Sequence, residues 1–209
     1  MELKDKYFYF TSALSTKFCD DVINYSLSKK VKTAVVGNKQ LKEVSGHELK
    51  DIKKNIRNSK ISWINDPWVY REISPYVKFA NEAANWNFDY DWMESVQVTN
   101  YSKKQYYHWH VDSFPEPFKN KDKNHNGKIR KISMTCQLSD PKDYEGGELE
   151  FAIPEVDKGK LTYTTFSLPE ILPKGSIVVF PSFVWHRVKP VTKGVRKSLV
   201  SWTIGRPFN

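Results

Sequence analysis

The stretch YYHWHVDSF, residues 106–114, places two histidines and a carboxylate within five positions. Aromatic and β-branched residues favour a strand, in which alternate side chains point to the same face. The pattern therefore predicts that His108, His110 and Asp112 point in one direction and Tyr107 in the other. Imidazole nitrogens and carboxylate oxygens bind transition metals, so this stretch is a candidate metal site.

The next histidine that matters for this site is distant in sequence. His186 lies in a second β-like run, and with His110 and Asp112 it has the form of a two-histidine, one-carboxylate facial triad. Such a triad covers one face of an octahedral Fe(II) and leaves three positions for a bidentate cosubstrate and O2. On an extended strand His108 would lie ~6.5–7 Å from His110, away from the compact triad that Asp112 and His186 form with His110. We therefore expect His108 to be an ordinary polar residue. The alternative is that it lies beside the ligands or on the substrate side of the site. The two remaining histidines are expected to be loop residues outside the metal site: His47 and His125.

An arginine that could bind a carboxylate follows His186 in the sequence. Arg196 lies ten residues further on, and Ser198 shares its face of the predicted strand. A guanidinium binds a carboxylate in a bidentate way, and a neighbouring hydroxyl adds a hydrogen bond. Beside a partly coordinated iron, this pair suits the distal carboxylate of 2-oxoglutarate. The alternative is a surface arginine on a terminal strand.

Helices are expected to support these strands from the N-terminal side. Segment 15–29 is predicted to be an amphipathic helix capped by Ser15 or Thr16. A second helix is predicted from Asp66, as the N-cap, and Pro67, with Pro75 kinking or splitting it. Its expected inner stripe comprises Trp68, Ile73, Val77 and Ala80. Between the helices, residues 31–60 are weakly patterned, with a short strand expected near TAVV.

From residue 91 the character of the chain changes to short β-like runs separated by Gly, Pro, Asn and Asp. There are eight: WMESVQVTNY, QYYHWHVD, IRKISMTCQLSD, GELEFAI, KLTYTTFSL, GSIVVFPS, WHRVKPV and RKSLVSWTIG. Helices followed by strands predict an α+β fold that ends in a jelly roll or barrel. The polar insertion 115–128 is a candidate lid.

Composition indicates one globular domain over residues 1–209, with helical support to about residue 90 and the β core after it. No signal peptide or membrane span is expected, and Cys19 and Cys136 are expected to be buried thiols, which fits a reducing cytoplasmic setting. The net charge of +9 is scattered, which favours a solvated surface over a nucleic-acid interface. Anionic small molecules or an anionic protein would suit the same charge.

The sequence resembles the prolyl 4-hydroxylase-like branch of the Fe(II)/2-oxoglutarate dioxygenases, including bacterial and phage PKHD-type hydroxylases. The family pattern Tyr-x2-Gly-x2-Tyr-x2-His-x-Asp falls on YSKKQYYHWHVD, with Lys104 in place of the glycine, which puts the shape of that turn in doubt. Further matches are RKISMTCQLSDPKDYEGGELEF, PKGSIVVFPSFVWHRVKPVTKGVR and SLVSW. The resemblance covers about residue 95 to the end, and more loosely residue 8 through the N-terminal helices. It implies a double-stranded β-helix (jelly roll) with N-terminal packing helices.

The resemblance also implies roles for individual residues. It makes His110, Asp112 and His186 the iron ligands and Arg196 the anchor of the 2-oxoglutarate carboxylate. Further cosubstrate-pocket residues implied in this way are Tyr101, Gln137, Ser198 and Trp202, with Trp202 closing the pocket from behind. Gln137 stands where several relatives carry a tyrosine. Gly146 and Gly147 are expected to form a tight turn with a packing role.

The implied activity is hydroxylation of an unactivated C–H bond with release of succinate and CO2, using Fe(II), 2-oxoglutarate and optionally ascorbate. The expected substrate is a prolyl residue of a peptide or protein, with a small amino-acid-like molecule as an alternative. An oxidative nucleic-acid demethylase is less favoured, since the second arginine expected six residues after Arg196 is Trp202. A non-catalytic jelly-roll binding module and a cupin-type isomerase are weaker alternatives still.

Overall fold

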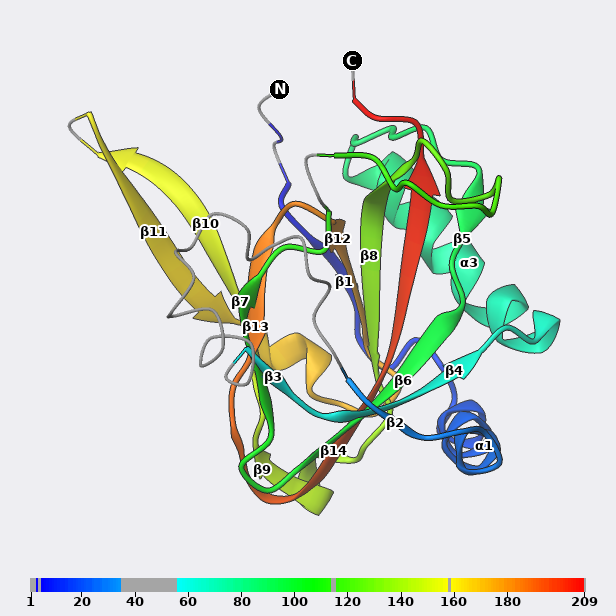
Figure 1. The fold of residues 1–209 in the computed structure, drawn as a ribbon. Helices are drawn as coiled ribbons and strands as arrows, with labels where there is room; N and C mark the ends of the chain where they lie inside the picture. Colours follow the sequence, from blue (N-terminus) through cyan, green and yellow to red (C-terminus); the bar gives the residue numbers. More distant parts are fainter. Residues whose placement is uncertain (1–2, 4, 35–55, 114–115, 158, 209) are drawn as a thin grey trace, which may run out of the picture.

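The computed structural model describes residues 3, 5–34, 56–113, 116–157 and 159–208. Two antiparallel sheets face each other (Figure 1). In spatial order the larger sheet contains β1 (Phe8–Phe10), β12 (Ile177–Pro181), β8 (Ile129–Gln137), β14 (Val191–Gly205), β6 (Val96–Ser102), β4 (Lys60–Ile64) and β2 (Lys32–Thr33). Two further short strands, β5 (Trp92–Met93) and β9 (Tyr144–Gly146), also pair with β14. The smaller sheet contains β11 (Lys160–Ser167), β10 (Leu149–Asp157), β13 (Trp185–Val188), β7 (Tyr106–His110) and β3 (Arg57–Asn58).

This arrangement confirms the predicted jelly roll, and every one of the eight predicted β runs contains a strand. The N-terminal part contributes more than helical support, because four of its short segments also extend the sheets. β1 pairs with β12, β4 pairs with β6 and β2 pairs with β4 in the larger sheet, while β3 pairs with β7 in the smaller one. The strand predicted near TAVV overlaps β2 only at Thr33; Ala34 follows outside the strand, and residues 35–36 lie outside the described residues, as does His47.

The first predicted helix is confirmed as α1, Thr16–Leu27. The Ser15 side chain accepts a hydrogen bond from the Phe18 backbone N–H at 3.1 Å, which satisfies one of the free donors of the first turn.

The second predicted helix is α3, Pro67–Ala83, and Pro75 does not split it. A proline in a helix leaves the carbonyl four residues earlier without its donor. Here that carbonyl belongs to Arg71, and both residues lie on the exposed side, where water can take the donor's place. The inner stripe also differs by one position, because Val69 is buried and Trp68 is half-buried against the rings of Phe18 and Tyr25 in α1.

Both helices pack on one face of the larger sheet (Figure 1). Alternation along β8 sends Ile132, Met134 and Cys136 into this apolar core and turns Ser133, Thr135 and Gln137 toward the smaller sheet. β14 follows the same rule, with Leu199 in the core and Arg196 and Ser198 on the opposite face. The larger sheet therefore presents a polar inner face, and this face forms the floor of the site described below.

A second apolar cluster fills the space between the sheets beyond this polar face, with Phe151 and Phe180 at its centre. The hairpin of β10 and β11 projects past the body of the molecule (Figure 1). Cys19 and Cys136 are both free and buried, as predicted. None of the described helices is long and apolar enough to cross a membrane.

Candidate metal centre and cosubstrate pocket

A bulge in β7 changes which side chains share a face. His186 of β13 lies opposite His110 and Val188 lies opposite Tyr107, so three steps along β7 match two along β13. The extra residue shifts the alternation of side chains. Tyr107 consequently stacks on His110, with ring centroids 3.5 Å apart, and His108 is exposed. The prediction that His108 and His110 point in the same direction is therefore wrong.

The three predicted ligands nevertheless come together. One ligand atom from each of His110, Asp112 and His186 lies within 4.8 Å of the others, and all three residues are buried. The Nε2 atoms of His110 and His186 lie 3.7 and 3.6 Å from the two carboxylate oxygens of Asp112. Two strands of the smaller sheet and the turn after β7 thus bring two imidazoles and one carboxylate to a single point.

Hydrogen bonds set the tautomer of each histidine. The Nδ1 atom of His110 lies 2.7 Å from the His108 carbonyl oxygen, and Nδ1 of His186 lies 2.9 Å from the Val184 carbonyl oxygen. A carbonyl only accepts, so each Nδ1 carries the proton and each Nε2 presents its lone pair to the cluster. Metal-binding histidines in proteins are held in this way.

The Asp112 carboxylate is held in place by a hydrogen bond and is ionised. Ser133 Oγ, on the polar face of β8, donates to Asp112 Oδ2 at 2.7 Å, and the Asp112 backbone N–H donates to the Ser182 carbonyl at 2.8 Å. Burial alone would raise the pKa of Asp112, but His186, His110 and Arg130 together outweigh burial and lower the pKa to about 2.

The pKa of His110 is held well below its ordinary value, chiefly by burial and then by His186. At neutral pH the cluster therefore combines a carboxylate with a neutral imidazole at His110, which are the protonation states that metal binding requires.

A pocket extends from the cluster along the polar face of β14. The triad, Arg196, Ser198, Tyr101 and Trp202 all line it. Arg196 is 4% exposed, its Nη1 has no hydrogen-bond partner, and the described residues offer it no ion pair. Burying an unpaired cation is costly, so this guanidinium is arranged for an anion that enters the pocket.

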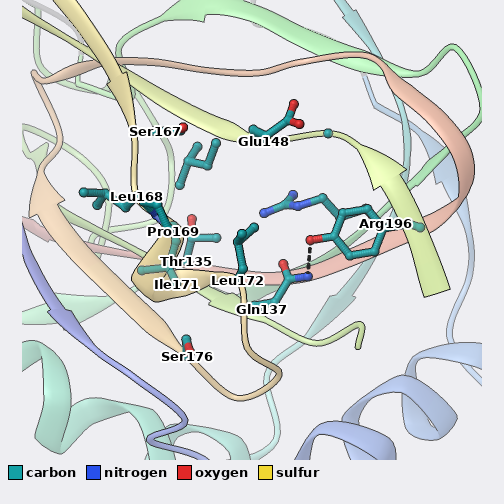
Figure 2. Close-up of a pocket in the computed structure, with 13 residues that line it drawn as sticks. Thr135, Gln137, Glu148, Ser167, Leu168, Pro169, Ile171, Leu172, Ser176 and Arg196 are labelled. Atoms are coloured by element: carbon teal, nitrogen blue, oxygen red, sulfur yellow. Dashed lines mark hydrogen bonds between the residues drawn. The ribbon is translucent and has the colours of Figure 1, made fainter. Parts of the chain in front are cut away.

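The remaining predicted pocket residues occupy distinct places. Tyr101 lies opposite Arg196 in the β6–β14 ladder, with its ring centroid 5.9 Å from the guanidinium carbon. Trp202 lies opposite Ser133 in the β8–β14 ladder, at the end of β14 near the metal cluster, and lines the same pocket. Gln137 lines a second, smaller cavity that shares Arg196 with the first (Figure 2).

Sequence reasoning missed several residues of the site. Ser133 was identifiable in principle, since it lies on the same face of β8 as Gln137. Arg130 carried no signal, because only the fold shows that its guanidinium pairs with Glu94 and lies 3.9 Å from the centroid of the Trp202 ring. Arg57 also lines the pocket, with its guanidinium carbon 4.5 Å from the centroid of the Tyr107 ring.

The candidate lid is described from residue 116 onward. Phe118 pairs with Lys128 and Gly127 through backbone hydrogen bonds, which closes the loop on itself. His125 lies outside the metal cluster, as predicted, and its Nε2 is 3.6 Å from Glu94 Oε1. The loop is thereby linked to the Glu94–Arg130 pair at the pocket wall.

The donor set fits Fe(II), and the buried, unpaired guanidinium fits a carboxylate of 2-oxoglutarate. The family model described as the 2OG-Fe(II) oxygenase superfamily matches residues 96–204, more than half of the chain. The chain belongs to this superfamily. Fe(II) and 2-oxoglutarate are accordingly the metal and cosubstrate that the family and the triad imply.

Curated relatives of the oxygenase are PKHD-type hydroxylases. The protein from Synechococcus sp. (strain JA-2-3B'a(2-13)) is 42% identical over 71 residues, which cover 34% of this chain and 27% of the relative. The one from Synechococcus sp. (strain CC9902) is 36% identical over 111 residues, covering 53% and 41% respectively. The matched part of the oxygenase thus spans less than half the length of these relatives.

Solved structures share its fold over nearly the whole chain. The viral collagen prolyl hydroxylase vCPH from Paramecium Bursaria Chlorella virus-1, in complex with 2OG, has a TM-score of 0.63 and 20% identity, and the match covers 97% of both chains. A Pseudomonas putida prolyl-4-hydroxylase has a TM-score of 0.62 and 16% identity, with 96% of this chain and 93% of that chain covered. At these identities the likeness concerns the fold.

Proposed function

We propose that the protein is an Fe(II)- and 2-oxoglutarate-dependent dioxygenase that hydroxylates an unactivated C–H bond, and that residues 1–209 form one such domain. A single observation carries the proposal: the buried cluster of His110, Asp112 and His186 shares one pocket with a buried arginine that has no anion partner among the described residues. A non-catalytic binding module would have no need for either feature.

The residues of the pocket have separate tasks in this proposal. His110, Asp112 and His186 hold Fe(II) through two Nε2 atoms and one carboxylate oxygen. Ser133 keeps the Asp112 carboxylate oriented, and Arg196 with Ser198 binds the distal carboxylate of 2-oxoglutarate. The bound metal and cosubstrate supply the oxidation of the C–H bond by O2, with release of succinate and CO2.

For the substrate we propose a prolyl residue of a peptide or protein, with a small amino-acid-like molecule as the second candidate. Two proteins with this fold are a collagen prolyl hydroxylase and a prolyl-4-hydroxylase, and the sequence relatives are PKHD-type hydroxylases. Arg57 and Trp63 also line the pocket, and the Trp63 side chain is partly exposed. These groups offer a cation and an apolar ring to a bound chain.

An oxidative nucleic-acid demethylase has less support. Trp202 occupies the position of the second arginine, and Arg130, which lies against it, is already paired with Glu94. Glu94 therefore already neutralises the charge of Arg130, and Arg130 cannot take the place of the missing second arginine.

The proposal is tested by anaerobic titration of the purified protein with Fe(II) and then with 2-oxoglutarate. A keto acid chelated to ferrous iron gives a weak visible charge-transfer band near ~500 nm. We expect this band in the native protein and its loss in Asp112→Ala, after which proline-containing peptides can be screened for succinate release. A folded, iron-loaded protein without the band contradicts the proposal and favours the binding module.

A further inference from the structure

The second cavity raises a question about how the cosubstrate carboxylate is held. Arg196 projects into this cavity, and Gln137 approaches it from β8 (Figure 2). Both cavities share Arg196, so the residues around this second cavity are candidates for holding the carboxylate that Arg196 binds.

Tyr144 supplies a hydroxyl at this point. The Gln137 Nε2 donates to the Tyr144 hydroxyl oxygen at 2.8 Å and to the Ser139 carbonyl at 3.2 Å, so both amide protons are used. The Tyr144 oxygen is therefore an acceptor in this contact, and its own proton remains free to donate. No acceptor for that proton is found among the described residues.

The backbone is shaped to bring Tyr144 to this place. β9 pairs with β14 two residues before Arg196, with Tyr144 opposite Gly194. A Cβ atom at Gly194 would lie 2.0 Å from the Asp143 carbonyl oxygen, so only glycine allows the two strands to approach in this way. Tyr144 is buried and lines the same cavity as Arg196.

We propose that Tyr144 is a cosubstrate-binding residue, whose hydroxyl donates to the distal carboxylate held by Arg196, and that Gln137 positions this hydroxyl. A guanidinium and a hydroxyl donor together satisfy more of a carboxylate's lone pairs than the arginine alone. In this chain the hydroxyl donor comes from β9, beside the strand that carries Arg196. This inference rests on the proposed function.

The test measures binding rather than turnover. Isothermal titration of the Mn(II)-loaded protein with 2-oxoglutarate compares the native chain with Tyr144→Phe. We expect the dissociation constant to rise about ten- to a hundredfold, as for loss of one hydrogen bond to a charged group. Oxalate, which chelates the metal and has no distal carboxylate, is expected to bind both proteins equally.

A second variant examines the positioning role. Gln137→Leu should weaken 2-oxoglutarate binding less than Tyr144→Phe does, and the double variant should match Tyr144→Phe alone, because the amide acts through the hydroxyl. Additive losses would contradict a shared role.

The possible outcomes separate the two proposals. If the native protein binds Mn(II) but not 2-oxoglutarate, the proposed function fails and this inference fails with it. If the native protein binds 2-oxoglutarate and Tyr144→Phe binds it equally well, only this inference is overturned. Equal weakening of 2-oxoglutarate and oxalate would show that Tyr144 supports the structure rather than the carboxylate.

Discussion

Gly147 lies in the turn between β9 and β10, next to the Arg196 side chain of the cosubstrate site. It has φ +69, and a Cβ atom at this position would lie 2.8 Å from Val191 Cγ2 and 3.1 Å from Arg196 Cδ. The glycine pair, expected to serve packing only, therefore also determines where the Arg196 side chain can lie. Replacing Gly147 with alanine should push this side chain away from its place in the pocket.

The magnitude follows from two contributions. A non-glycine residue in the left-handed region costs about 1 kcal/mol, and the overpacking adds about 1–3 kcal/mol. Gly147→Ala should therefore lower the free energy of unfolding by about 2–4 kcal/mol. Gly159→Ala is the matched control, because its φ is +77 and, apart from its chain neighbours, no atom of the described residues lies within 4 Å of the added Cβ. That variant should lose only about 1 kcal/mol.

The assays are urea unfolding of the metal-free proteins and titration of the Mn(II)-loaded proteins with 2-oxoglutarate. We expect Gly147→Ala to bind the cosubstrate at least about tenfold more weakly and Gly159→Ala to bind it normally. If both variants lose the same stability and keep native affinity, Gly147 does not position Arg196 and the reasoning is refuted.

Three further predictions concern the turn, the metal cluster and its pH dependence. Lys104 has φ +66, so the turn keeps the glycine-type backbone despite the lysine. In urea unfolding, Lys104→Gly should raise the free energy of unfolding by up to about 1 kcal/mol. A lower free energy of unfolding would show instead that the lysine side chain stabilises the turn. His108→Ala should leave Mn(II) affinity within about twofold of native, because only the backbone carbonyl of His108 supports His110, whereas His110→Ala should weaken it at least about a hundredfold; equal effects in calorimetric titrations would place His108 in the site. The folded-state pKa of Asp112 is about 2, below its ordinary value, so its stabilising effect on the metal-free protein is present above about pH 4 and is lost as the pH falls toward 2. Asp112→Asn should remove about 2 kcal/mol of this acid-dependent stability between pH 5 and pH 2, and an unchanged acid limb in unfolding experiments would contradict the shift.

Much of the fold could be predicted because local rules decided it. Ser15 caps α1, and the alternation of β8 separates its apolar residues from Ser133 and Gln137. Helices followed by eight β-like runs were enough to predict a jelly roll or barrel, and the His-x-Asp spacing identified His110 and Asp112 as candidate ligands. The spacing from His186 to Arg196 likewise placed both residues beside one pocket, since β13 and β14 follow each other through a short connection.

Other features depended on contacts between distant segments. The bulge that turns Tyr107 onto His110 and leaves His108 exposed arises from the pairing of β7 with β13, and no local pattern in β7 marks it. The approach of Tyr144 to Gln137 requires β9 to lie against β14, which the backbone of Gly194 permits. Residue types and spacing therefore determined which groups could hold a metal and a carboxylate. Strand register, which depends on the packing of the whole molecule, decided which neighbours surround them.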